Sequence, residues 1–218
     1  MFRQILYTQW KWSGLGIVAA ALASFVLPIL TVQGAGTSDP TWIDARALLP
    51  ALEYWSRAYP ALALAIGLLG GTMAWTNDHR GRHVYALTLP LPRWHYVLLR
   101  YGAGLALLLV PVLLLWAGAM LAGRMATIPP GLHAYPHALA LRFGLAVLLA
   151  YSIFFAVSSG TTRTAGYVIG VVAGLMVLQV LILLSGSETR LVAPIFDRLV
   201  TLPGPFEIFG GRWMLIDV

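Results

Sequence analysis

Five histidines are the residues in this chain whose spacing could most readily support chemistry. His79 and His83 lie four residues apart in HRGRH, and His133 and His137 lie four apart in HAYPH. On a helix this spacing puts two imidazoles on one face, where they could bind a metal ion. Pro136 interrupts any helix through the second pair, and neither pair has a third histidine close by. We therefore expect loop histidines in contact with solvent and headgroups, and no metal site.

The sequence contains few residues that could support other kinds of catalysis. The chain has no cysteine, which excludes disulfides and thiolate sites. Its single lysine, Lys11, lies in QWKWS, so a phosphate-binding loop ending in Gly-Lys-Ser/Thr is excluded too. No Asp or Glu falls within the apolar runs, so a buried carboxylate pair for acid–base catalysis is not expected. The sequence predicts no catalytic residue, no cofactor and no ATP site in this chain.

The elements that must hold these residues are membrane helices. The sequence is 59% hydrophobic and 10% charged, with a mean hydropathy of +0.80, whereas soluble domains carry about 25% charged residues. Helices are the only expected elements, because the apolar runs lack the alternation of barrel strands. The sequence predicts an all-α, polytopic helical bundle forming one domain over residues 1–218. Five runs approach the roughly 20 residues needed to cross a bilayer: 13–32, 59–76, 97–121, 138–157 and 164–184.

Segments outside these runs also have a predictable character. Residues 2–12 are amphipathic and predict a helix lying in the headgroups before the first span. Within the long loop after that span, residues 44–55 could form a short amphipathic helix. Residues 185–218 carry several prolines among apolar side chains and could form short segments at the interface.

The charge distribution bears on partners and orientation. The net charge of +6 comes from basic residues scattered among spans and loops, which favours attraction to anionic headgroups over nucleic-acid binding. Lys and Arg divide evenly between the two sides, but their densest cluster lies in the 77–100 loop. We therefore expect a cytosolic N-terminus. The Arg-, Ala- and Leu-rich composition with a single lysine indicates a GC-rich bacterial genome, so we expect the bacterial inner membrane as the location.

A few residues within the spans invite interpretation. Arg100 and Arg142 lie near span ends, where we expect both to snorkel towards water. A functional role at membrane depth is the alternative for Arg142. Gln179 could line a pathway or form a hydrogen bond between helices, and both interpretations stay open.

Small residues in the fifth run predict a helix-packing face. Its glycines recur at four-residue spacing, which lets helices approach closely in lipid: Gly166, Gly170 and Gly174. Whether this face packs within one chain or between two chains is open.

The segment NDHRGRHVYALTLPLPRWHYVLLR, residues 77–100, is the most informative loop. It begins with charged residues, continues with apolar ones, and reaches Pro90 and Pro92, which end any regular helix. Arg93 and His95 then lead into the third span. A short, rigid surface helix of this kind would pass the motion of a cytosolic partner to the two adjoining membrane helices.

These features together resemble the permease subunits of type 2 ATP-binding-cassette exporters (ABC-2 permeases). The resemblance lies in the interfacial N-terminal helix, in the element ALTLPLPRWHYVLLRYGAG, in the small-residue turn SIFFAVSSGTTRTAGYVIG, and in the proline-rich segments after the fifth span. It covers essentially the whole chain, through pattern rather than an invariant motif. The family usually has six spans, and this sequence shows five.

The resemblance implies a transporter whose ATP and Mg²⁺ are bound by a separate cytosolic ATPase. It also implies a second permease, either another copy or a homologue, and a coupling helix in the loop between spans 2 and 3. The positions that would contact the ATPase are Asp78, Arg80, Arg82, Tyr85, Leu87, Leu89, Pro90 and Arg93, with Arg163 at the second cytosolic turn. The alternatives are a non-transporting scaffold or immunity-type subunit, which the missing span favours, and a membrane enzyme that uses the histidine loops.

Overall fold

The structure is a computed structural model that describes residues 2–35, 45–80, 92–160 and 206–217, with single positions between 161 and 205. It divides into two units, Met1–Phe155 with Arg212–Val218, and Ala156–Gly211, which are treated separately. The elements are α1 (Phe2–Gly34), α2 (Ala45–Ser56), α3 (Ala58–Arg80), α5 (Arg93–Met125), β1 (His133–Ala134), α6 (Pro136–Ser159), the 3₁₀ turn η1 (Glu207–Phe209) and β2 (Ile216–Asp217).

Four helices in the described part of the chain are long and apolar enough to cross a membrane. They are Phe2–Gly34, Leu48–Trp75, Trp94–Met125 and Pro136–Ser159. The first four predicted spans coincide with these helices, the second ending one residue beyond Trp75, so the four long apolar helices are confirmed. The fifth predicted span, 164–184, falls mostly outside the described residues and stays a prediction.

The N-terminal segment corrects one expectation. We predicted a separate interfacial helix over residues 2–12, but α1 runs unbroken from Phe2 to Gly34. Its buried positions continue at four-residue spacing through Gln9, Ser13 and Ile17. The first turns therefore share one packing face with the span, which explains why the helix does not break between them.

The second span is longer than its apolar run suggested. The expected short helix near residues 44–55 is present as α2, and only Arg57 separates it from α3. The candidate span accordingly begins at Leu48, inside α2. Tyr59 and Leu52, one from each helix, are both buried.

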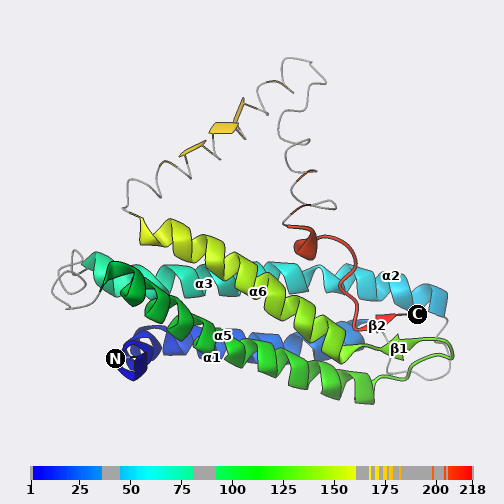
Figure 1. The fold of residues 1–218 in the computed structure, drawn as a ribbon. Coiled ribbons are helices and arrows are strands. Elements are labelled where there is room, and N and C mark those ends of the chain that lie inside the picture. The colour runs from blue at the N-terminus through cyan, green and yellow to red at the C-terminus, as the bar shows by residue number, and fades with distance from the viewer. Residues whose placement is uncertain are drawn as a thin grey trace. The chain divides into compact units, whose positions relative to one another are not determined.

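Helices α1 and α5 run parallel and lie side by side (Figure 1). Near their starts, the Gln9 amide nitrogen donates to the Arg100 carbonyl at 3.1 Å. Further along, a Cβ added to Gly118 would lie 2.2 Å from the Phe25 carbonyl oxygen, so only glycine allows this close approach. Because residue numbers rise together at both contacts, the two helices point the same way.

Helix α3 runs antiparallel to that pair. Its beginning meets the end of α1, where the Tyr59 and Thr31 hydroxyls are 2.9 Å apart. Its end meets the beginning of α5, where Arg100 donates to the Ala74 carbonyl. Helices α1, α3 and α5 thus alternate in direction, as in an up-and-down helical bundle.

Helix α6 runs parallel to α3 and antiparallel to α5. Trp75 of α3 donates through Nε1 to the Phe155 carbonyl at 3.1 Å. Trp116, towards the end of α5, donates to His137 Nδ1 at the start of α6, at 3.0 Å. Pro136 opens α6, where its missing N–H is tolerated.

The bundle therefore has two distinct ends. The proximal end holds the starts of α1 and α5 and the last turns of α3 and of α6 up to Phe155. The distal end holds α2, the end of α5 and the start of α6, and residues 212–217 pack there. Strand β2 pairs with β1 in antiparallel register, His133 opposite Asp217. Figure 1 shows the two termini at opposite ends of this unit.

Candidate functional site

The predicted coupling segment lies between two packed helices at the proximal end. Helix α3 ends at Arg80 and α5 begins at Arg93, so residues 81–92 join antiparallel neighbours there. Asp78 lies in the last turns of α3, and the structure does not describe its side chain or those of Arg80 and Arg93. The remaining predicted contact residues lie outside the described part: Arg82, Tyr85, Leu87, Leu89, Pro90 and Arg163.

A charged side chain is buried in the first turns of α5. Arg100 is only 5% exposed. Its Nε donates to the Ala74 carbonyl at 2.5 Å, and one Nη donates to the Tyr96 hydroxyl. The guanidinium carbon lies 5.0 Å from the centre of the Trp75 ring and 5.4 Å from that of Tyr96. These distances are typical of cation–π contacts. Arg100 thus links the last turns of α3 to the first turns of α5.

The burial of Arg100 corrects the expectation that it snorkels to water. A snorkelling side chain must extend past its neighbours, whereas this one is enclosed by Trp75 and Tyr96 and hydrogen-bonds inward to α3. The sequence held a usable signal, because Tyr96 and Arg100 stand four residues apart on one helix face. The position of Trp75 depends on helix pairing and could not be derived from the sequence.

Aromatic rings extend the linkage from α3 and α5 to α6. The ring centres of Trp75 and Phe155 are 5.2 Å apart, as are those of Tyr101 and Tyr151. The Tyr151 hydroxyl donates to the Tyr101 carbonyl at 3.1 Å, and the Tyr101 hydroxyl lies 2.7 Å from the Ser152 hydroxyl. Three helices are therefore joined at the proximal end by rings and hydrogen bonds.

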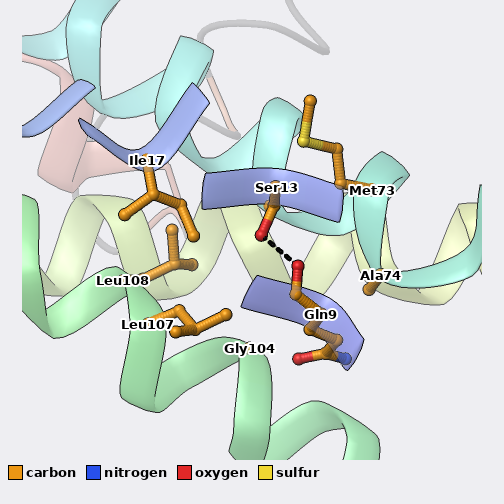
Figure 2. Close-up of a pocket in the computed structure, with 9 residues that line it drawn as sticks. Gln9, Ser13, Ile17, Met73, Ala74, Gly104, Leu107 and Leu108 are labelled. Carbon is orange, nitrogen blue, oxygen red and sulfur yellow. Dashed lines mark hydrogen bonds between the residues drawn. The ribbon is translucent and has the colours of Figure 1, made fainter. Parts of the chain in front are cut away.

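Helix α1 joins the same cluster through a buried glutamine. Gln9 is 8% exposed and donates through its amide nitrogen to the Arg100 carbonyl. Its amide oxygen has no hydrogen-bond donor among the described residues. Figure 2 shows this side chain beside a small cavity between α1, α3 and α5, where Ser13 donates to the Gln9 carbonyl.

The size of that cavity limits its role. Its volume is about 20 Å³, enough for a single water molecule that could donate to the Gln9 amide oxygen. It is far too small for a transported solute. Buried side chains at the proximal end therefore join four helices, α1, α3, α5 and α6.

The histidine pairs do not come together as metal ligands in the part of the chain described. His133 lies in strand β1, whereas His137 lies on α6 and accepts a hydrogen bond from Trp116. The side chains of His79 and His83 are not described. Among the described residues, no group of three or more His, Asp or Glu side chains could hold a metal.

Arg142 occupies a second polar cluster, at the distal end. Its guanidinium carbon lies 4.6 Å from the centre of the Trp213 ring, and an Nη donates to the Arg212 carbonyl at 2.5 Å. Arg142 therefore contacts the C-terminal residues, which sequence reasoning had not placed near it.

The predicted glycine face is not tested by the structure. Gly166 lies outside the described residues, and a Cβ built at Gly170 or Gly174 meets no described atom within 4 Å. A different small-residue face is visible. Added Cβ atoms at Gly67 and Gly71 of α3 would lie 2.4 Å and 2.7 Å from atoms of α6. The four-residue spacing of this pair is the signal that could have revealed it.

Comparison with known proteins found no match to any protein-family model, to any curated protein or to any solved structure.

Proposed function

We propose that this chain is the membrane permease subunit of an ATP-driven exporter of the ABC-2 type. A separate cytosolic ATPase, carrying ATP and Mg²⁺, would contact residues 77–93, and a second permease would complete the pathway. The observation that best supports this proposal is the set of contacts around Arg100, which we call the Arg100 junction. These contacts join the end of α3 to the start of α5, the two helices that flank the predicted contact segment.

The junction gives the proposal a mechanical basis. Force applied to residues 81–92 reaches the end of α3 and the start of α5 simultaneously. Arg100 and Trp75 then couple these ends to each other and to Phe155 of α6. Buried side chains in close packing transmit displacement with little compression. A cytosolic motor would therefore move α3, α5 and α6 as one body.

The membrane topology of the proposed transporter includes a fifth crossing. Phe155 lies beside Trp75 at the proximal end, whereas the carbonyl of Arg212 accepts from Arg142 at the distal end. Between residues 142 and 155 the helix rises about 20 Å. We propose that residues 156–211 return across the membrane between these two ends. The predicted span 164–184 supplies one crossing.

Orientation follows from the same arrangement. With the N-terminus in the cytosol, the proximal end and its basic segment face the cytosol, as the positive-inside tendency favours. The distal end then faces away from the cytosol. We accordingly propose the bacterial inner membrane as the location.

Charge reversal in the contact segment tests this function. In the double variant Arg82→Glu with Arg93→Glu, we expect an at least tenfold loss of ATPase captured when the tagged chain is purified from native membranes. The measurement is ATP hydrolysis and protein identification in the captured fraction. Membrane insertion should be unchanged, because neither side chain lies in a span.

A matched control makes the same change at the other end. Arg46→Glu with Arg212→Glu alters the charge equally at the distal end, outside the four candidate spans, and should leave ATPase capture as in the unmodified chain. Equal capture by both double variants would remove the basis for the proposal.

A further inference from the structure

Residues 212–217 form a short strap at the distal end of the bundle, which we call the distal strap. Strand β2 of this strap pairs with β1, and the Tyr135 N–H donates to the Leu215 carbonyl at 2.8 Å. Trp213, Leu215 and Ile216 are each no more than 2% exposed. The strap is therefore docked on the bundle, with its apolar side chains buried.

Helices α3 and α6 pack against each other through small residues in a regular register. Corresponding positions recur every four residues along both helices: Gly71 with Phe154, Gly67 with Ala150, and Ala63 with Ala146. Cβ atoms added to the two glycines would collide with α6, and both alanines of the third pair are 0% exposed. The two helices therefore stay close together as far as Ala63.

The distal strap occupies the next position of this register. Four residues further towards the distal end, the register brings Tyr59 of α3 opposite Arg142 of α6. The Trp213 ring stacks on Tyr59, with centres 6.4 Å apart and an interplanar angle of 9°. The guanidinium carbon of Arg142 lies 4.6 Å from the centre of the same indole ring. Trp213 thus fills the opening between α3 and α6 at their distal ends.

The contacts that dock the strap are ones that can be released. Strands β1 and β2 are only two residues long each. Arg212 Nε is 3.8 Å from a Glu53 carboxylate oxygen, and both side chains are well exposed, so this ion pair contributes little. The buried indole N–H of Trp213 has no acceptor among the described residues. Such a group is costly to bury, and release of the strap would return it to water.

The chain immediately before the strap has the character of a hinge. Gly210 and Gly211 precede Arg212, and Gly211 has a φ of 66°, in the left-handed region that glycine adopts without strain. Hinges are a few loop or element-terminal residues that absorb large changes in φ and ψ. These two glycines would let the strap leave the bundle while the helices keep their packing.

We propose that residues 212–217 are a releasable strap that closes the distal end of the bundle between α3 and α6. In the docked state Trp213 fills the opening between these helices. In the released state the strap turns about Gly210 and Gly211, and the opening faces the water on the distal side. In the proposed permease the strap is the distal gate. That role rests on the proposed function, whereas release of the strap does not and is tested without an ATPase.

A buried cysteine on the strap reports its release. The chain has no cysteine, so Leu215→Cys introduces a single thiol. Leu115→Cys, at a position of α5 that is 0% exposed, is the matched core site. Each purified full chain is treated with a maleimide in detergent, and each rate is divided by that of the same variant unfolded in denaturant. We expect position 215 to react at least tenfold faster than position 115, because release of the strap is a local opening.

A second substitution tests what holds the strap. Arg142→Gln should speed the labelling of position 215 about tenfold, because a charged hydrogen bond and a ring contact to the strap are lost. It should leave position 115 unchanged. Arg124→Gln, which removes the same charge from an exposed side chain near the end of α5, is the control and should change neither rate.

Three results would overturn the proposal. Equal normalised rates at positions 215 and 115 would show that the strap leaves only when the whole bundle unfolds. An unchanged rate at position 215 in the Arg142→Gln background would show that Arg142 does not hold the strap. An equal increase at both positions would show that Arg142 stabilises the whole bundle and has no separate effect on the strap.

Discussion

At the scale of single residues, the buried charge of Arg100 has an energetic cost that its neighbours must offset. A charged side chain taken out of water loses several kcal/mol of hydration unless polar groups replace it. Here two aromatic faces, a hydroxyl and a backbone carbonyl surround the guanidinium. Lysine has no planar group to stack against two rings, which explains the choice of arginine.

We predict that Arg100→Gln lowers the free energy of unfolding by about 3 kcal/mol, from the loss of the ring contacts and a charged hydrogen bond. Arg100→Lys keeps the charge and loses the planar stack. Its free energy of unfolding should lie between those of Arg100→Gln and the unmodified chain. Thermal unfolding in one detergent measures both. A melting temperature for Arg100→Gln equal to that of the unmodified chain would show that the junction contributes nothing to stability.

Individual residues also show where sequence reasoning succeeds and where it fails. The apolar context correctly placed Arg100 near the start of a span, but the sequence could not indicate whether the side chain turns outward or inward. That choice depends on Trp75, which lies on another helix. Arg142 presents the same difficulty, because its ring partner Trp213 is far away in the chain.

At the scale of elements, glycine determines how closely the helices approach. Tyr151 of α6 passes so near Gly104 that an added Cβ would lie 2.1 Å from its hydroxyl oxygen. Gly67 and Gly71 act similarly between α3 and α6. Van der Waals packing at such contacts drives helix association in lipid, where the hydrophobic effect between helices is absent.

We predict that Gly67→Ala and Gly71→Ala each destabilise the bundle by about 1–3 kcal/mol, because the added methyl must push α3 from α6. Gly14→Ala is the matched control. A Cβ there lies 3.5 Å from the nearest atom of Trp10, an ordinary contact. Unfolding in denaturant measures the three variants. Equal stability of Gly14→Ala and Gly67→Ala would show that α3 and α6 are not closely packed at Gly67.

The sequence predicted where the long helices lie, but it predicted less well where each helix begins and ends. Long apolar runs located α1, α3, α5 and α6, because a span must satisfy its backbone within itself. The unbroken α1 was missed because its first turns carry polar residues that suggested a surface helix. Of these polar residues Gln9 is buried, and its contact with the Arg100 carbonyl of α5 is not something that hydropathy registers.

At the scale of the whole molecule, the order of the helices constrains the path of the chain. The segment after α6 begins at the proximal end and rejoins the bundle at the distal end. The proposed topology places an odd number of membrane crossings within residues 156–211. Residues near 86 and residue 212 should therefore face opposite sides of the membrane.

The absence of cysteine makes this prediction convenient to test. Single variants Ala86→Cys, Thr127→Cys and Arg212→Cys are treated in intact cells with a membrane-impermeant maleimide. We expect labelling at 127 and 212, and labelling at 86 only after permeabilisation. Labelling of 86 and 212 from the same side would contradict the odd number of crossings.

The central claim is that residues 77–93 contact a cytosolic ATPase. Site-specific cross-linking tests this contact most directly. A photoreactive phenylalanine derivative replaces Tyr85 in native membranes, and Thr127 at the distal end is replaced as the control. The account predicts an adduct between position 85 and a nucleotide-binding ATPase, with none from position 127. An adduct pattern that lacks an ATPase at position 85, or shows the same one at both positions, would contradict it.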